Sequence, residues 1–132
     1  MLYQNALTIE ADNPKLYFDI SECYSKKSDW NNSVLMLEKA IPLDSLNPTF
    51  YNNRGLVYWK LKQDQNAISD YKKALTLDTK SWVIYSNLST AYYTNKEEKK
   101  ACETFNIAES LGLTENVIDN DKHLKAVQES CK

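Results

Sequence analysis

Residues 51–78 read YNNRGLVYWKLKQDQNAISDYKKALTLD, and this stretch decides the fold. Tyr51, Gly55 and Tyr58 follow one another at steps of four and three residues, which places them on one face of an α-helix. A second face with helical spacing comes next, formed by Ala67, Tyr71, Ala74 and Leu77. The polar residues 62–64 between the two faces predict a tight turn. The stretch is therefore expected to form two antiparallel helices, with Gly55 close to Ala67 where they cross.

The same pattern returns every 34 residues along the chain. One alanine recurs at Ala6, Ala40, Ala74 and Ala108. A large apolar or aromatic residue recurs at Tyr3, Leu37, Tyr71 and Phe105. Tyrosines recur at Tyr17, Tyr51, Tyr85 and at Tyr24, Tyr58, Tyr92. A fixed period of this length predicts stacked helical hairpins, each of which buries its apolar face against its neighbours.

The boundaries of the units follow from helix-start signals. Asn13-Pro14 and Asn47-Pro48 each place an N-cap asparagine before proline, and Ser81 precedes the third unit. We expect a single domain over residues 1–132. It would comprise a half repeat at 1–13 (second helix only), repeats at 14–47, 48–81 and 82–113, and a C-terminal capping helix at 114–132. The apolar stripe of the capping helix would be Leu124, Val127 and Cys131.

The composition excludes several classes of function. With only two glycines and three prolines in 132 residues, the chain lacks the turn residues of an all-β protein. A net charge of −2 with interspersed signs argues against nucleic acid as a partner. No apolar run is long enough to span a membrane. Phosphate-binding loops and nucleophile motifs are absent, so we expect no enzymatic activity and no cofactor.

The compartment stays open. The first five residues lack the charged and apolar regions of a signal peptide. That leaves the cytoplasm, or the periplasm if a leader has been removed. A composition rich in Asn, Lys and Tyr is typical of a bacterial genome with low GC content.

The motif Tyr51-x-x-Arg54-Gly55-x-x-Tyr58, followed by Ala67, Tyr71, Ala74 and Leu77-Asp78, resembles the tetratricopeptide repeat. Two details depart from that family's pattern: Ser21 stands where glycine is favoured, and proline does not follow Asp44 or Asp78. The resemblance implies an all-α fold, a right-handed superhelix of stacked antiparallel helix pairs (an α-α solenoid). It also implies a scaffold for protein–protein interaction.

In this family the first helix of each unit lines the concave face, which usually holds a peptide or a partner helix. Carried over by position, the predicted peptide-binding groove comprises Phe18, Glu22, Asn52, Asn53, Leu56, Trp59, Asn87, Thr90 and Tyr93. Asn53 and Asn87 lie one repeat apart, and each amide can both donate to and accept from a peptide backbone. The aromatic residues would supply contact area. The alternative is that the asparagines are solvated and the aromatic side chains pack between helices.

Some relatives bind a C-terminal carboxylate through a clamp of Lys, Asn and Arg. The clamp positions here hold Phe18, Glu22, Asn53, Val83 and Asn87, of which only Asn53 matches. Because Glu22 would repel a carboxylate, we expect no binding of chaperone tails of that kind.

Four other residues have chemistry of their own. Arg54 replaces the apolar Ile20 and Leu88, and we expect its stem to pack while its head stays in water. We expect the single histidine, His123, to be a solvated residue at a helix start, because no partners are spaced for a metal site or a general base. Cys102 and Cys131 either form a disulfide or stay as two thiols. With three cysteines, no C-x-x-C pair and one histidine, a four-ligand zinc site is excluded.

The preferred function is a scaffold that binds a peptide or a partner protein segment in the concave groove. The alternatives are a self-associating module, which would form homo-oligomers, and a regulatory fragment of a larger multidomain protein. The identity of the partner does not follow from the residues.

Overall fold

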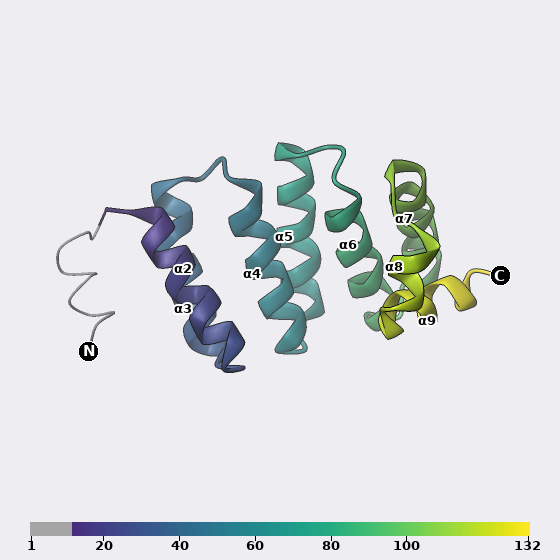
Figure 1. Cartoon of the computed structure of the whole chain (residues 1–132), viewed down its shortest axis with the longest axis horizontal. Helices are drawn as coiled ribbons and strands as arrows, with labels where there is room; N and C mark the ends of the chain where they lie inside the picture. Colours follow the sequence, from purple (N-terminus) through teal and green to yellow (C-terminus); the bar gives the residue numbers. More distant parts are fainter. Residues whose placement is uncertain (1–11) are drawn as a thin grey trace.

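A computed structural model describes residues 12–132 of the chain. Within them it contains eight helices and no strand (Figure 1). The helices are α2 (Pro14–Lys26), α3 (Trp30–Leu43), α4 (Pro48–Lys60), α5 (Asp64–Leu77), α6 (Trp82–Thr94), α7 (Glu98–Leu111), α8 (Glu115–Asp119) and α9 (Lys122–Ser130). Apart from residues 12 and 13, the predicted half repeat at 1–13 lies outside this part of the chain. None of the helices in residues 12–132 combines the length and the apolar character needed to cross a bilayer.

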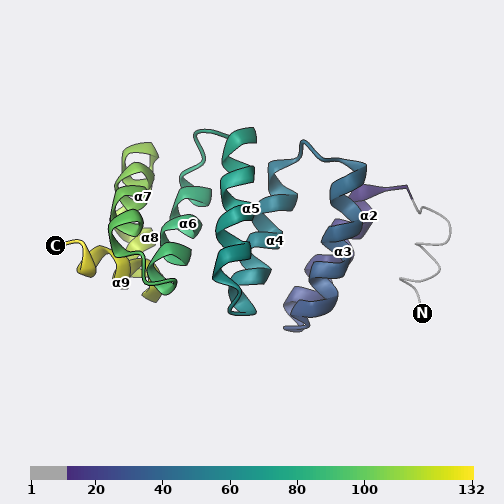
Figure 2. The same cartoon turned by 180° about the vertical axis from the view of Figure 1, so that it is seen from behind.

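Helices α2 to α7 form three antiparallel pairs that stack side by side. The largest contacts are within the pairs α2–α3, α4–α5 and α6–α7, and smaller ones join α3 to α4 and α5 to α6. Both views show the pairs following one another along the long axis (Figures 1 and 2). The all-α fold and its right-handed superhelix of stacked pairs are therefore confirmed.

Each helix pair begins and turns in the same way. The side chains of Asn13 and Asn47 accept hydrogen bonds from backbone N–H groups of the first turn, at 3.0 Å in each case. Between the two helices of each pair, one residue has a positive φ: Ser28 (56°), Lys62 (63°) and Lys96 (65°). These three residues are 34 apart, although none of them is the glycine that favours this conformation.

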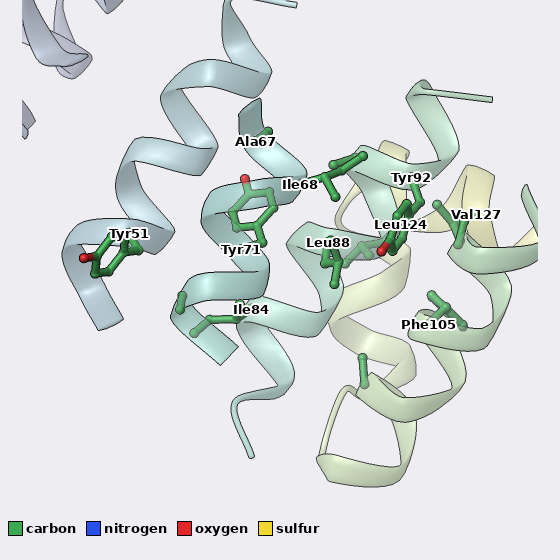
Figure 3. Close-up of a cluster of buried hydrophobic side chains, with 14 of the residues drawn as sticks. Tyr51, Ala67, Ile68, Tyr71, Ile84, Leu88, Tyr92, Phe105, Leu124 and Val127 are labelled. Atoms are coloured by element: carbon green, nitrogen blue, oxygen red, sulfur yellow. The ribbon is translucent and has the colours of Figure 1, made fainter. Parts of the chain in front are cut away.

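The core runs continuously through the array. Ala40, Ala74 and Ala108 are completely buried, which lets the helix backbones approach closely. Figure 3 shows Tyr51, Ala67 and Tyr71 at one end of this cluster and Phe105, Leu124 and Val127 at the other. At Gly55 the closest side chain is that of Tyr71, whose Cε1 would lie 2.8 Å from an added Cβ.

The expectation for Arg54 was wrong. Its guanidinium does not reach into water but donates two hydrogen bonds to Asp70 on α5, at 2.7 Å from Nε and 2.8 Å from NH2. The Asp70 side chain is 7% exposed and that of Arg54 21%. The hydrogen bonds to Asp70 raise the pKa of Arg54 above its ordinary value. The pair therefore ties the two helices of the second unit together.

The C-terminal region contains two helices rather than the single capping helix predicted for 114–132. The break lies at Asn120 and Asp121, where the Asp121 carboxylate accepts from the backbone N–H groups of His123 and Leu124 at 2.9 and 3.2 Å. This N-cap starts α9 in a new direction. Helix α9 packs against both α6 and α7. Helix α8 lies in front of α7 in Figure 1 and behind it in Figure 2, so the segment folds back over one face of the last pair.

Candidate peptide-binding groove

An open hollow lies between α2, α3 and α4. We call it the first hollow; its volume is about 290 Å³. It is lined by Ser21, Glu22, Ser25, Lys26, Trp30, Ser33, Leu37, Asn53, Leu56, Val57 and Lys60. Three residues of the predicted groove thus come together here: Glu22, Asn53 and Leu56. Leu56 is 39% exposed and contributes an accessible apolar surface to this hollow.

One side chain in the wall of the first hollow differs in size between the units. Leu37 on α3 occupies the position that Tyr71 holds in the second unit and Phe105 in the third. Both aromatic rings are almost completely buried, and Tyr71 also lines the smaller hollow of the second unit. Because leucine is smaller than tyrosine, the first unit has more free space at this position than the second.

Polar groups cover part of the wall of the first hollow. The Ser33 hydroxyl donates to the Ser21 carbonyl at 2.9 Å, and Ser25 and Ser33 share a hydrogen bond of 2.8 Å. Nearby, the Lys60 ammonium lies 5.9 Å from the centre of the Trp30 ring. An apolar floor with a few hydroxyl, amide and ammonium groups is the usual composition of a site that binds part of a ligand.

A second hollow lies one repeat further along the groove. Its volume is about 230 Å³, and its lining residues are Leu56, Trp59, Lys60, Tyr71, Asn87, Thr90, Asp121 and His123. The predicted groove residues Trp59, Asn87 and Thr90 therefore gather here. They share the hollow with two residues of the C-terminal segment, which the sequence did not place in the groove.

Several of the predicted groove residues also contact other residues of the protein. The amide of Asn87 donates to Asn52 at 3.0 Å, so these two asparagines bind each other across α4 and α6. The Phe18 ring stacks on Phe50 with 5.2 Å between centroids. Tyr93 is half-buried against the core. The hypothesis that Asn53 and Asn87 act alike on a peptide therefore stays a prediction, and Asn53 is the more available of the two.

His123 lies at a helix start, as expected, but it is half-buried rather than fully solvated. Its ring meets the Trp59 ring edge-on, with 4.8 Å between centroids, and Trp59 Nε1 donates to the Thr94 hydroxyl at 3.1 Å. Burial lowers the pKa of His123 below its ordinary value of 6.5. The charge of Asp121 opposes this shift, and the nearby cations Lys122, Lys60 and Lys62 add to it.

The stability of the protein should therefore fall between pH 7.5 and pH 5.5. Below about 6.5 the unfolded chain binds a proton on this histidine that the folded chain resists, so the free energy of unfolding decreases as the pH falls through that window. Urea unfolding at the two pH values measures the effect. The matched control is His123→Gln, which does not titrate and should lose less. Equal losses in both proteins would contradict the prediction.

The structure brings Cys102 and Cys131 together. Their Cα atoms lie 5.5 Å apart and their sulfur atoms are joined as a disulfide that connects α7 to the end of α9. Cys23 is a free, half-buried thiol. Within residues 12–132, no group of three or more His, Cys, Asp or Glu side chains is arranged to hold a metal ion.

Comparison with known proteins agrees with this architecture. Residues 48–80 match the family described as tetratricopeptide repeat. No curated protein sequence matches the chain significantly. The TPR domain of Arabidopsis OM64 is 25% identical, with a TM-score of 0.78 over 89% of this chain and 93% of that one.

Two further solved structures are similar. The TPR2B domain of yeast Sti1, in a complex with pHsp70, is 25% identical, with a TM-score of 0.72 over 93% of this chain and 94% of that one. A crystal structure of MamA is 21% identical, with a TM-score of 0.83 over 97% of this chain and 69% of that one. With the 34-residue motif, the matched repeat and the shared superhelix in agreement, residues 48–80 are a tetratricopeptide repeat, and the chain has the fold of tetratricopeptide repeat domains.

Proposed function

We propose that the chain is a protein-interaction scaffold that binds an extended segment of a partner protein in its concave groove. The observation that carries this proposal is the first hollow, which is open, largely apolar and adjacent to the exposed Leu56. The Sti1 domain, solved in a complex with pHsp70, supports the same use of the fold. One apolar or aromatic side chain of the partner would enter the first hollow, where burial supplies most of the affinity.

Asn53 and Lys60 would hold the peptide beside that anchor. An amide at the rim can accept a backbone N–H and donate to a backbone carbonyl at once. A carboxyl-terminal tail is a poor match for the groove, because the clamp that some relatives use for such tails is absent: of its positions only Asn53 carries the matching residue, and Glu22 stands at another. We therefore propose an internal segment of the partner as the ligand rather than its C-terminus.

Filling the first hollow should weaken binding without unfolding the protein. Leu37→Phe introduces the residue that the third unit carries at this position, in a unit that also has a buried serine, Ser89, in the place of Ser21. The variant should bind a peptide selected from a random display library on the wild-type protein at least about 10-fold more weakly, because the anchoring side chain has no space. Fluorescence anisotropy with the labelled peptide measures the change.

The matched control is Leu35→Phe. It makes the same substitution on the same helix, at a position that is 49% exposed and does not line the first hollow. It should bind the peptide like the wild type. Unchanged binding in Leu37→Phe, with thermal unfolding showing an intact fold, would place the ligand elsewhere and refute the proposal.

A further inference from the structure

The two hollows are the same site repeated. Asn53 and Lys26 of the first hollow correspond, 34 residues on, to Asn87 and Lys60 of the second. The other equivalent pairs are Glu22 and Leu56, Ser25 and Trp59, Leu37 and Tyr71, and Leu56 and Thr90. A ligand that follows the groove would therefore pass both hollows in turn, one repeat apart.

Only the second hollow contains residues from outside the repeats. Asp121 and His123 line it, and the His123 ring lies against Trp59 on α4, a whole unit before the last helix pair. The C-terminal segment thus sits where the equivalent wall of the first hollow is open. Its residues Asp121 and His123 form one wall of the second hollow, which is the smaller of the two.

Buried side chains and a covalent bond hold this segment in place. Ile118 and Val127 are completely buried and Leu124 is 4% exposed, all within the main core. In Figure 3, Leu124 lies beside Tyr92 and Val127 lies near Phe105. At its far end, Cys131 is joined to Cys102 on α7. The segment is therefore connected to the array both where it leaves α7 and where α9 ends.

We propose that the C-terminal segment, residues 114–132, is a lid over the second hollow and that the Cys102–Cys131 disulfide latches it. Reduction by a dithiol breaks the Sγ–Sγ bond: the dithiol gives two electrons and two protons, leaves as a disulfide, and two cysteine thiols remain. Released at its far end, the segment has many more conformations available when it detaches. The second hollow would then lose the wall formed by Asp121 and His123 and widen along the groove.

The size of the effect follows from chain entropy. The disulfide joins residues 29 apart in sequence. With the bond intact a detached segment still forms a closed loop, of which the part after α7 is flexible. Loss of the bond should raise the equilibrium constant for opening on the order of 100-fold. A peptide that needs both hollows gains affinity by the same factor, because the binding-competent form is that much more populated.

Hydrogen exchange on the full chain tests the latch without any ligand. In the Cys23→Ser background, which prevents exchange with the third thiol, the amides of α9 should exchange on the order of 100-fold faster after dithiothreitol treatment. Those of α4 and α5 should keep their rates. The variant Cys102→Ser/Cys131→Ser should match the reduced protein under all conditions.

Two results would overturn this inference. One is a mass measurement showing that Cys102 and Cys131 are free thiols in protein that has not been treated with a reductant. The other is that the amides of α9 exchange at the same rate before and after reduction. The lid acts on the groove, so its consequence for binding rests on the proposed function. The proposed function and the lid can fail separately. The Leu37→Phe variant tests binding in the first hollow, and the hydrogen-exchange experiment tests only the lid.

Discussion

Asp70→Met should destabilise the protein by about 3 kcal/mol, the largest loss we expect from a change to one charged residue. The substitution removes the carboxylate that accepts two hydrogen bonds from Arg54, and it leaves the guanidinium half-buried without a partner. Asp70 itself is 5% exposed, so water cannot replace the lost contact at its position. Urea unfolding followed by circular dichroism measures the change.

The repeat supplies the control for this prediction. The first unit carries Ile20 and Met36 at the positions of Arg54 and Asp70, so Arg54→Ile/Asp70→Met rebuilds an apolar pair that the same fold already contains. The double variant should lie within about 1 kcal/mol of the wild type, because replacing both members of a buried ion pair is nearly neutral. A double variant as unstable as the single one would show that the loss comes from packing rather than from an uncompensated charge.

The periodicity of the sequence was enough to predict the fold. Positions such as Ala74 and Tyr71 must be apolar in every unit, because each hairpin buries the same face against its neighbours. Asparagine followed by proline indicated two helix starts, and both asparagines cap their helices in the structure. The turns were harder to predict. Lys62 adopts a positive φ, which a lysine in the sequence does not predict. Only its 34-residue spacing from Ser28 and Lys96 indicates that the three residues share a conformation.

The pairing of Arg54 with Asp70 could not be predicted from periodicity. It occurs in one unit alone, and the two residues lie 16 apart on different helices. Comparing the units shows only what they share, so a contact present in one unit appears as two separate exceptions to the pattern. The signal that could have indicated the pair is that both exceptions are charged, with opposite signs: Arg54 and Asp70 stand where the other units have uncharged residues.

The candidate site could be predicted only where it is built from the repeats. Glu22, Asn53 and Leu56 lie on the first helices of their units, and the superhelix brings them to one hollow. One wall of the second hollow comes from the C-terminal segment, which lies outside the repeat and has no equivalent to compare with. Its break at Asp121 turns His123 toward Trp59, and one short apolar stripe cannot predict that direction.

Gly55→Val should cost about 3 kcal/mol of stability. A Cβ at this position would lie 2.8 Å from Cε1 and 2.9 Å from Cδ1 of Tyr71, closer than real Cβ atoms come to a neighbour. The Tyr71 ring is 1% exposed and packed in the core, so it could relieve this contact only by moving toward the second hollow, which it lines. Overpacking of this kind costs about 1–3 kcal/mol, and the two further methyl groups of valine place this substitution at the upper end. Thermal and urea unfolding measure the loss.

Ser21→Val is the matched control, because Ser21 holds the same position in the first unit, where the opposing residue is the smaller Leu37 beside an open hollow. It should cost about 1 kcal/mol or less, since space is available there. The second variant, Gly55→Val/Tyr71→Leu, should recover part of the loss because it removes the ring that the new side chain meets. Equal losses at positions 21 and 55 would mean that helix geometry, rather than the Tyr71 ring, demands the glycine. The smaller Leu37 would then not account for the larger volume of the first hollow.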